Sequence, residues 1–151
     1  MDCVAGYFHV MAYLGTSNPL VEVVLPAIPT SVGTARTVVG DAAAHIAVEQ
    51  RIVDEIRLCV SEAVTNSVRH AYGADRGTVQ VVVTKADDEL IVVVCDQGAG
   101  FRSSSRVQDE PGGLGLGIID ALTSRHAISS SADLGTEIRM TFALGSKAPL
   151  V

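Results

Sequence analysis

Two runs rich in β-branched residues, separated by a short polar segment, constrain the fold of this 151-residue chain more than any other feature. Residues 78–84 (TVQVVVT) and 90–95 (LIVVVC) have the composition of β-strands, and residues 85–89 (KADDE) have the polarity and length of a hairpin connection. We therefore expect an antiparallel pair of strands in the middle of the chain.

Three elements are expected before this hairpin. Residues 21–25 (VEVVL) predict a strand that ends at the prolines at positions 26 and 29. A one-sided helix is expected from Thr30 or Ser31 to Ile46, because its apolar residues recur at helical spacing. A second helix is expected from about Glu49 to Tyr72, ending at Gly73. Its core-facing residues should be Ile56, Val60, Ala63, Ser67 and Ala71.

The second half of the chain predicts a long loop followed by a helix and a closing hairpin. Residues 96–117 are rich in glycine, and a loop of this length in a compact domain usually has a function. A short helix is expected over 116–125, and residues 126–131 and 136–144 predict a hairpin around Asp133-Leu134-Gly135. This order of elements predicts an α+β fold, a two-layer α/β sandwich with the helices on one face of a mixed sheet.

Composition and charge narrow the class of protein. Hydrophobic residues make up 48% of the chain, and no long polar tract is present, so we expect one folded globular domain. The net charge of −6 and the lack of a basic cluster argue against direct binding to nucleic acid. The three cysteines are odd in number and lack C-x-x-C spacing, so we expect all three to be reduced and the protein to be cytoplasmic.

The N-terminal segment is apolar, and its role is open. Residues 3–14 are fewer than the roughly 20 needed to span a bilayer, and they follow Asp2 rather than a positive region. We therefore expect neither a membrane span nor a signal peptide. The segment could be a strand, a partner-binding arm or an extension upstream of the true start, and the sequence does not choose among these three. We assign residues 1–18 to an N-terminal extension, 19–145 to the folded domain and 146–151 to a C-terminal tail.

The second predicted helix carries a polar face. Glu62 and Asn66 are four residues apart and should project from the same side about one turn apart, with Arg69 near that face. An Asn carbonyl oxygen can ligate Mg²⁺, and a neighbouring carboxylate can accept a proton from an attacking hydroxyl. Taken alone, the same spacing also fits a solvated helix face with an internal Glu–Arg pair.

Two glycine-rich motifs follow. Asp96 ends the strand of residues 90–95 and opens the sequence DQGAG, where a carboxylate can accept hydrogen bonds from an amine such as that of adenine and glycines let a flat ring approach the backbone. Alone, this could be an ordinary strand-ending turn. Residues 112–119 (GGLGLGII) lead into a helix, where free backbone N–H groups attract phosphate. This motif is neither a P-loop nor a Rossmann fingerprint.

The order of the three motifs resembles the GHKL superfamily of ATPases, which includes DNA gyrase B, histidine kinases and MutL. Glu62-Ala63-Val64-Thr65-Asn66 is similar to its N box, Asp96-Gln97-Gly98-Ala99-Gly100 to its first glycine box, and Gly113-Leu114-Gly115-Leu116-Gly117 to its second. Gly135-Thr136 is similar to a late Gly-Thr element. Residues 60–66 followed by His70-Ala71-Tyr72 most resemble bacterial anti-sigma-factor serine kinases of the RsbW and SpoIIAB type. The resemblance covers residues 20–144.

The resemblance implies a role for each matching residue. Glu62 would be the general base, Asn66 the Mg²⁺ ligand and Asp96 the adenine anchor. ATP would further contact Arg69, the glycines at 98 and 100, residues 113–117 and Thr136. An arginine of the loop, Arg102 or Arg106, would reach the γ-phosphate. Arg36 lies in a region used for partner docking, or is a solvated charge.

The resemblance also implies partners. Such a protein would bind ATP and Mg²⁺, phosphorylate a serine on an anti-sigma-factor antagonist of the STAS type, sequester a sigma factor and form a homodimer. Two alternatives stay open. The domain could be a non-catalytic ATP-binding partner switch, or the ATPase part of a histidine kinase, although the region of Ala44-His45-Ile46 lacks the usual flank of a phosphoacceptor histidine.

Overall fold

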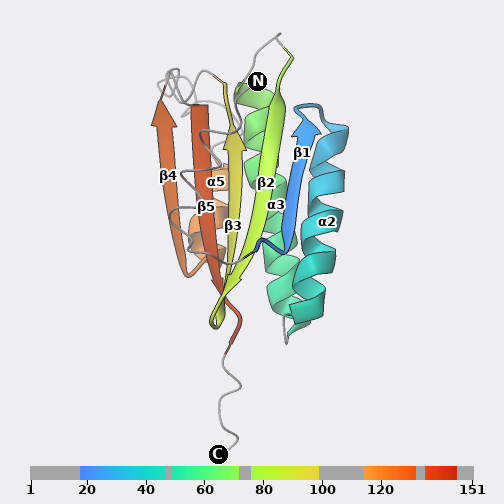
Figure 1. Cartoon of the computed structure of the whole chain (residues 1–151). Coiled ribbons are helices and arrows are strands. Elements are labelled where there is room, and N and C mark those ends of the chain that lie inside the picture. The colour runs from blue at the N-terminus through green and yellow to red at the C-terminus, as the bar shows by residue number, and fades with distance from the viewer. Residues whose placement is uncertain (1–17, 47–48, 72–75, 99–113, 132–134, 146–151) are drawn as a thin grey trace, which may run out of the picture.

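The fold of the protein was obtained as a computed structural model, which describes residues 18–46, 49–71, 76–98, 114–131 and 135–145. Five strands form one sheet: β1 (Val21–Pro26), β2 (Thr78–Ala86), β3 (Glu89–Asp96), β4 (Arg125–Ser131) and β5 (Gly135–Ala143). Three helices, α2 (Thr30–Ile46), α3 (Gln50–His70) and α5 (Leu114–Leu122), all lie on one face of that sheet (Figure 1). The predicted two-layer α/β sandwich is confirmed.

The sheet is antiparallel throughout, so the prediction of a mixed sheet was wrong. The strand order is β1-β2-β3-β5-β4, and every neighbouring pair is antiparallel. Two helices connect β1 to β2, which returns the chain to the same end of the sheet and reverses its direction. One helix connects β3 to β4, so these two strands run the same way, but β5 is inserted between them.

The expected central hairpin is present. Residues 79–86 of β2 pair with 89–96 of β3, and Asp87 in the turn has a positive φ of 52°. Asp is one of the residues that adopt this conformation at low cost in tight turns. The hairpin therefore forms for the local reasons that the sequence indicates.

The hydrophobic core lies between the helices and one face of the sheet. All five residues predicted for the core face of α3 are buried. The largest fully buried side chains include Ile56 of α3, Leu90 of β3, Ile119 of α5 and Met140 of β5. Cys59 is also buried here and Cys95 is partly buried, and both are reduced, as predicted, whereas Cys3 lies outside the described residues.

Helix α5 begins and ends earlier than predicted. It starts at Leu114, so the last four residues of the predicted loop are helical, because Leu116 and Ile119 pack against the core. It ends at Leu122 because Ser124 is already bonded to β5, where its N–H donates to Thr141 O at 2.8 Å. The strand predicted from His126 begins one residue earlier, at Arg125, whose guanidinium forms two hydrogen bonds with Glu89.

Among the described helices, none is long and apolar enough to cross a membrane. The hydrophobic positions of α3 instead recur at helical spacing and pack into the core, as expected for an amphipathic helix of a globular domain.

Candidate active site

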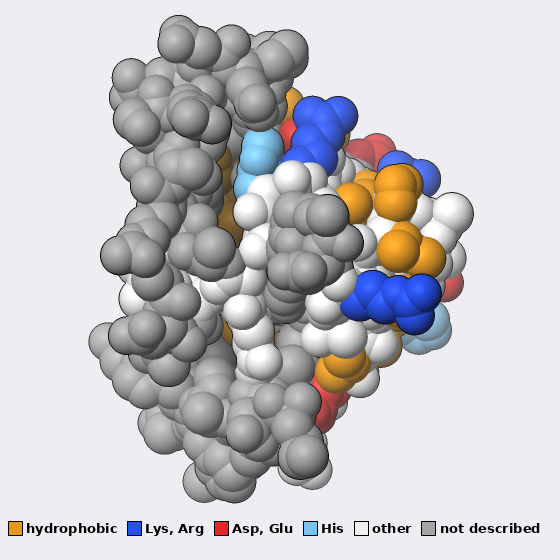
Figure 2. Space-filling view, turned by 90° about the horizontal axis from the view of Figure 1, so that it is seen from above, with side chains coloured by type: hydrophobic (Ala, Val, Ile, Leu, Met, Phe, Trp, Pro, Cys, Tyr) orange, Lys and Arg blue, Asp and Glu red, His pale blue; other side chains and the backbone are white. Residues whose placement is uncertain are grey.

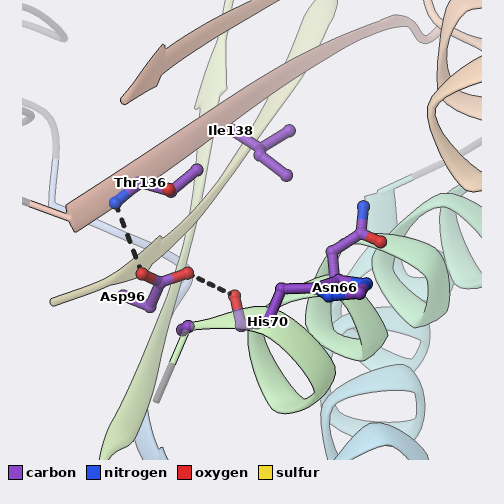
Figure 3. Close-up of a pocket in the computed structure, with 7 residues that line it drawn as sticks. Asn66, His70, Asp96, Thr136 and Ile138 are labelled. Atoms are coloured by element: carbon purple, nitrogen blue, oxygen red, sulfur yellow. Dashed lines mark hydrogen bonds between the residues drawn. The ribbon is translucent and has the colours of Figure 1, made fainter. Parts of the chain in front are cut away.

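A small hollow, open to solvent, lies where the end of α3 meets the end of β3 and the start of β5. Its lining residues are Asn66, Ser67 and His70 of α3, Ala71 directly after that helix, Asp96 of β3, and Thr136 and Ile138 of β5. Figure 3 shows these side chains around one space, with Asp96 opposite Asn66 and Thr136 beside Asp96. Two of the residues singled out as N-box and glycine-box positions, Asn66 and Asp96, thus share one site.

Asp96 is held by three hydrogen bonds from different parts of the chain. The Ser67 hydroxyl donates to Oδ2 at 2.8 Å, and the N–H groups of Gly98 and Thr136 donate to Oδ1 at 3.0 and 3.3 Å. Only 6% of the residue is exposed. A buried carboxylate fixed in this way has acceptor capacity left for one more donor in the hollow.

Burial raises the pKa of the Asp96 carboxyl above its usual range, and the hydrogen bonds from Ser67, Gly98 and Thr136 oppose that shift. Burial therefore disfavours the ionised form of Asp96, and a further hydrogen-bond donor in the hollow would stabilise it. Perturbed carboxylates in a hollow are common at functional sites.

Asn66 has an uncommitted amide. Its Nδ2 atom is buried and has no hydrogen-bond partner among the described residues. The nitrogen and oxygen of an Asn side chain exchange places by a half-turn, so this amide can present its oxygen to a bound ion. Among the described residues, no three His, Cys, Asp or Glu side chains cluster as a metal site. Any Mg²⁺ here would therefore take most of its ligands from phosphate and water, which is the usual pattern for this ion.

Glu62 does not line this hollow, and lies one turn earlier on α3 against the first turn of α5. A Cβ placed on Gly115 would be 2.7 Å from Glu62 Oε2, so a side chain at position 115 would collide with the carboxylate. The N-terminal end of a helix carries a partial positive charge that attracts anions. Glu62 is half-buried, and it lies next to the N-terminal end of α5, to which the sequence analysis assigns phosphate binding.

Gly98 has a different reason to be glycine than the sequence suggested. A Cβ at this position would lie 2.0 Å from the carbonyl oxygen of Ala71, at the end of α3. The absent side chain therefore lets the end of β3 contact the backbone of α3. This contact brings Asp96 within reach of Ser67.

This contact predicts that Gly98→Ala destabilises the fold. Because the obstacle is backbone, we expect a loss of at least about 1–3 kcal/mol in the free energy of unfolding, measured by urea denaturation. Gly117→Ala is the matched control, since a Cβ at position 117 has nothing within 4 Å and Ala favours a helix by about 0.5–1 kcal/mol. Equal stability of Gly98→Ala and the wild type would contradict the assignment.

Of the other predicted site residues, one lines the hollow, several lie elsewhere on the domain, and the rest fall outside the described residues. Thr136 contacts Asp96 through its backbone N–H, and its hydroxyl lies 3.1 Å from the Ser130 hydroxyl. Arg69 is exposed and is not among the residues lining the hollow, and Arg36 is exposed on α2. Leu116 is half-buried and Gly117 exposed, both in α5, which begins at Leu114. Gly100, Arg102, Arg106 and Gly113 lie outside the described residues.

Sequence reasoning missed four lining residues, of which Ser67 and His70 are polar and Ala71 and Ile138 are apolar. Ser67 was assigned to the core face of α3 and His70 to packing at the helix end, yet both line the hollow. A polar residue on an otherwise apolar helix face, next to Asn66, was the available signal for Ser67. Nothing local indicated that its partner is Asp96, 29 residues away.

Comparison with known proteins decides the family. Residues 25–142, most of the chain, match the histidine kinase-like ATPase domain. The chain belongs to this family. The name of the family implies a domain that binds ATP, and the matched region contains the whole hollow.

Several relatives of this ATPase domain carry functional names. The chain is 30% identical to the serine-protein kinase RsbW of Bacillus velezensis over 142 residues, which is 85% of this chain and 88% of the relative. It is 29% identical to the anti-sigma F factor of Caldanaerobacter subterraneus subsp. tengcongensis, covering 74% and 84% of the two chains. These similarities agree with the RsbW and SpoIIAB type of resemblance found in the sequence.

Solved structures show the same fold. The crystal structure of the RsbU and RsbW domains of a Mycobacterium tuberculosis protein matches 84% of this ATPase domain with a TM-score of 0.66 and 26% identity, and the match spans 32% of that longer chain. A histidine kinase domain from Erythrobacter litoralis, at 19% identity and a TM-score of 0.55, shares the fold.

Proposed function

We propose that the protein is an ATP-dependent serine/threonine protein kinase and anti-sigma factor. It phosphorylates an anti-sigma-factor antagonist of the STAS type and sequesters a sigma factor, and it acts in the cytoplasm as a homodimer. The observation that carries the proposal is the hollow shared by Asn66 and Asp96, in a family whose similar members are named serine-protein kinase RsbW and anti-sigma F factor.

The hollow suits the adenine end of ATP. The free acceptor capacity of Asp96 would take a hydrogen bond from the exocyclic amine, and Ile138 offers an apolar wall. From there, Asn66 lies along α3 toward Glu62 and the first turn of α5. The triphosphate would therefore run from Asp96 past Asn66 to residues 113–117.

The same residues fit a Mg²⁺-dependent transfer. The uncommitted amide of Asn66 would ligate Mg²⁺, which when bound neutralises phosphate charge. Glu62 would accept the proton of the attacking serine hydroxyl. A new bond then forms between the serine oxygen and the γ-phosphorus while the bond to the β-phosphate oxygen breaks, and ADP leaves.

Arg36 would contact a protein partner. It is exposed on α2, and Ile28 in the preceding loop is 47% exposed. Seen from the end of the molecule where α2 begins, basic and hydrophobic side chains lie next to each other on the side of β1 and α2 (Figure 2). A surface of mixed apolar and cationic character suits a protein interface.

The test is to identify the proteins that co-purify with this chain in ATP and in ADP, and to analyse them for phosphoserine and phosphothreonine by mass spectrometry. We expect one small partner to acquire the phosphate with ATP, and a sigma factor to be retained. A protein that binds ATP but phosphorylates none of its partners would instead be a non-catalytic partner switch.

We predict that Asn66→Ala weakens ATP binding chiefly when Mg²⁺ is present. Loss of the proposed protein ligand to the ion should lower the affinity at least about tenfold, and the difference should shrink in EDTA, as measured by calorimetry. Thr65→Ala is the matched control, since the Thr65 hydroxyl bonds Ser61 O within the helix and does not line the hollow. Wild-type affinity of Asn66→Ala in Mg²⁺ would remove the metal role.

A further inference from the structure

Ser67 differs from the neighbouring hydroxyl residues of α3 in the group to which it donates. A Ser or Thr inside a helix commonly donates to the carbonyl oxygen four residues earlier. Ser61 donates in this way to Arg57 O at 2.8 Å, and Thr65 to Ser61 O at 2.6 Å. Ser67 instead donates to Oδ2 of Asp96 on β3, 29 residues away in the chain, at 2.8 Å. Its hydroxyl is therefore committed to the hollow rather than to its own helix.

The two oxygens of the Asp96 carboxylate are used unequally. Oδ1 accepts from the N–H groups of Gly98 and Thr136 at 3.0 and 3.3 Å. Among the described residues, Oδ2 accepts only from the Ser67 hydroxyl. Each carboxylate oxygen can accept about two hydrogen bonds, so Oδ1 is fully used and Oδ2 has one position left. The oxygen that remains for a ligand is thus the one that Ser67 contacts.

We propose that Ser67 is a positioning residue for nucleotide selectivity, which holds Oδ2 of Asp96 as the acceptor for the exocyclic amine of adenine. The carboxylate is fixed through Oδ1 by backbone groups and through Oδ2 by α3, and it lies at the edge of the space that it shares with Asn66 (Figure 3). The amine and the Ser67 hydroxyl would share Oδ2. The inference rests on the adenine contact of the proposed function, but it does not depend on kinase activity.

The same hydrogen bond favours the ionised carboxylate, which is the stronger acceptor. Burial raises the pKa of Asp96, and of the three hydrogen bonds that oppose this shift the one from Ser67 has the largest effect. Among the described residues that line the hollow, His70 of α3 is the other titratable group. Val79, which pairs with Asp96 from β2, and Ile138 of β5 cannot ionise. Ser67 therefore acts on both the orientation and the charge of Asp96.

The test compares two nucleotides in two proteins. Purine riboside 5′-triphosphate has a hydrogen where ATP has its exocyclic amine, and calorimetry gives the affinity of each nucleotide for the wild type and for Ser67→Ala. We expect the wild type to bind ATP at least about tenfold more tightly than the analogue, as a hydrogen bond to a charged group provides. In Ser67→Ala this preference should fall below about threefold, because Oδ2 is no longer held toward the amine.

Thr65→Ala is the matched control. It removes a hydroxyl that bonds within α3, and it should keep the wild-type preference for ATP over the analogue. Both variants should fold, because Ala is the residue that favours a helix most. If Ser67 serves packing alone, Ser67→Ala would weaken both nucleotides equally, and an unchanged preference would overturn the inference. A wild type that does not distinguish the two nucleotides would instead remove the adenine contact of Asp96 from the proposed function, and the inference with it.

A second measurement follows ATP affinity as a function of pH. Without the Ser67 donor the pKa of Asp96 should be raised further, so the affinity of Ser67→Ala should begin to fall at a higher pH than that of the wild type. His70 is present in both proteins, so its own titration cancels in the ratio of the two affinities. Coincident pH profiles of the two proteins would overturn the inference.

Discussion

Replacing Glu62 with Ala should abolish phosphoryl transfer to the antagonist while ATP binding is retained. A general base contributes about 10²- to 10⁴-fold to a rate, so we expect at least a 100-fold loss in kcat. Nucleotide affinity should stay within a few-fold of the wild type, because Glu62 lies against Gly115 and does not line the hollow around Asp96. The measurements are single-turnover transfer from labelled ATP and calorimetry of ATP binding.

Glu55 provides the matched control on the same helix. It lies about two turns before Glu62, pairs with Arg51 at 2.6 Å on the surface, and, like Glu62, raises the pKa of Cys59. Glu55→Ala should therefore leave transfer unchanged and cost little stability, as exposed ion pairs contribute about 0–1 kcal/mol. Glu62→Gln keeps the shape of the side chain without its basicity. Transfer at the wild-type rate in either Glu62 variant would remove the base assignment.

Asp96→Asn should weaken ATP binding by about 10- to 100-fold, as measured by calorimetry. The variant keeps an oxygen for the N–H groups of Gly98 and Thr136, and its amide can donate to the Ser67 hydroxyl. It replaces the acceptor offered to the adenine amine with a donor or a weaker acceptor. Hydrogen bonds to charged groups contribute about 1.5–3 kcal/mol, and each 1.4 kcal/mol is about tenfold in affinity.

The stability of Asp96→Asn separates binding from folding. Because the pKa of Asp96 is raised in the folded protein, the folded state binds a proton more readily than the unfolded state. The stability contributed by this carboxyl is thus present at low pH and lost as the pH rises through the raised pKa. At neutral pH the Asn variant should be at least as stable as the wild type, and lost stability together with lost binding would contradict the assignment.

Acidification should change the ATP affinity of the wild type and of Asp96→Asn differently. Wild-type ATP affinity should fall as the pH decreases through the raised pKa of Asp96, starting at a higher pH than for an ordinary aspartate. The Asn variant lacks this titrating group and should not show that part of the decrease. Parallel pH profiles of the two proteins would exclude Asp96 as the titrating group.

Most of the fold was predictable because its signals are local. The central hairpin, the two long helices and the closing hairpin follow from periodicity and turn residues within about 20 positions of one another. The ends of α5 were misplaced because Leu116 and Ser124 are fixed by packing and by pairing with β5, which local propensity does not report. The mixed sheet was wrong for a similar reason, since the insertion of β5 between β3 and β4 is a choice among long-range pairings.

The sequence by itself determined which residues could do chemistry and how those within one element are spaced. Glu62 and Asn66 stand one turn apart on the same helix because hydrogen bonds over four residues set the helical repeat. Only the tertiary structure decided that Ser67 donates to Asp96, that Gly98 leaves room for the backbone of Ala71, and that Glu62 turns toward Gly115. These contacts join residues far apart in the chain, and their geometry depends on how the whole core packs.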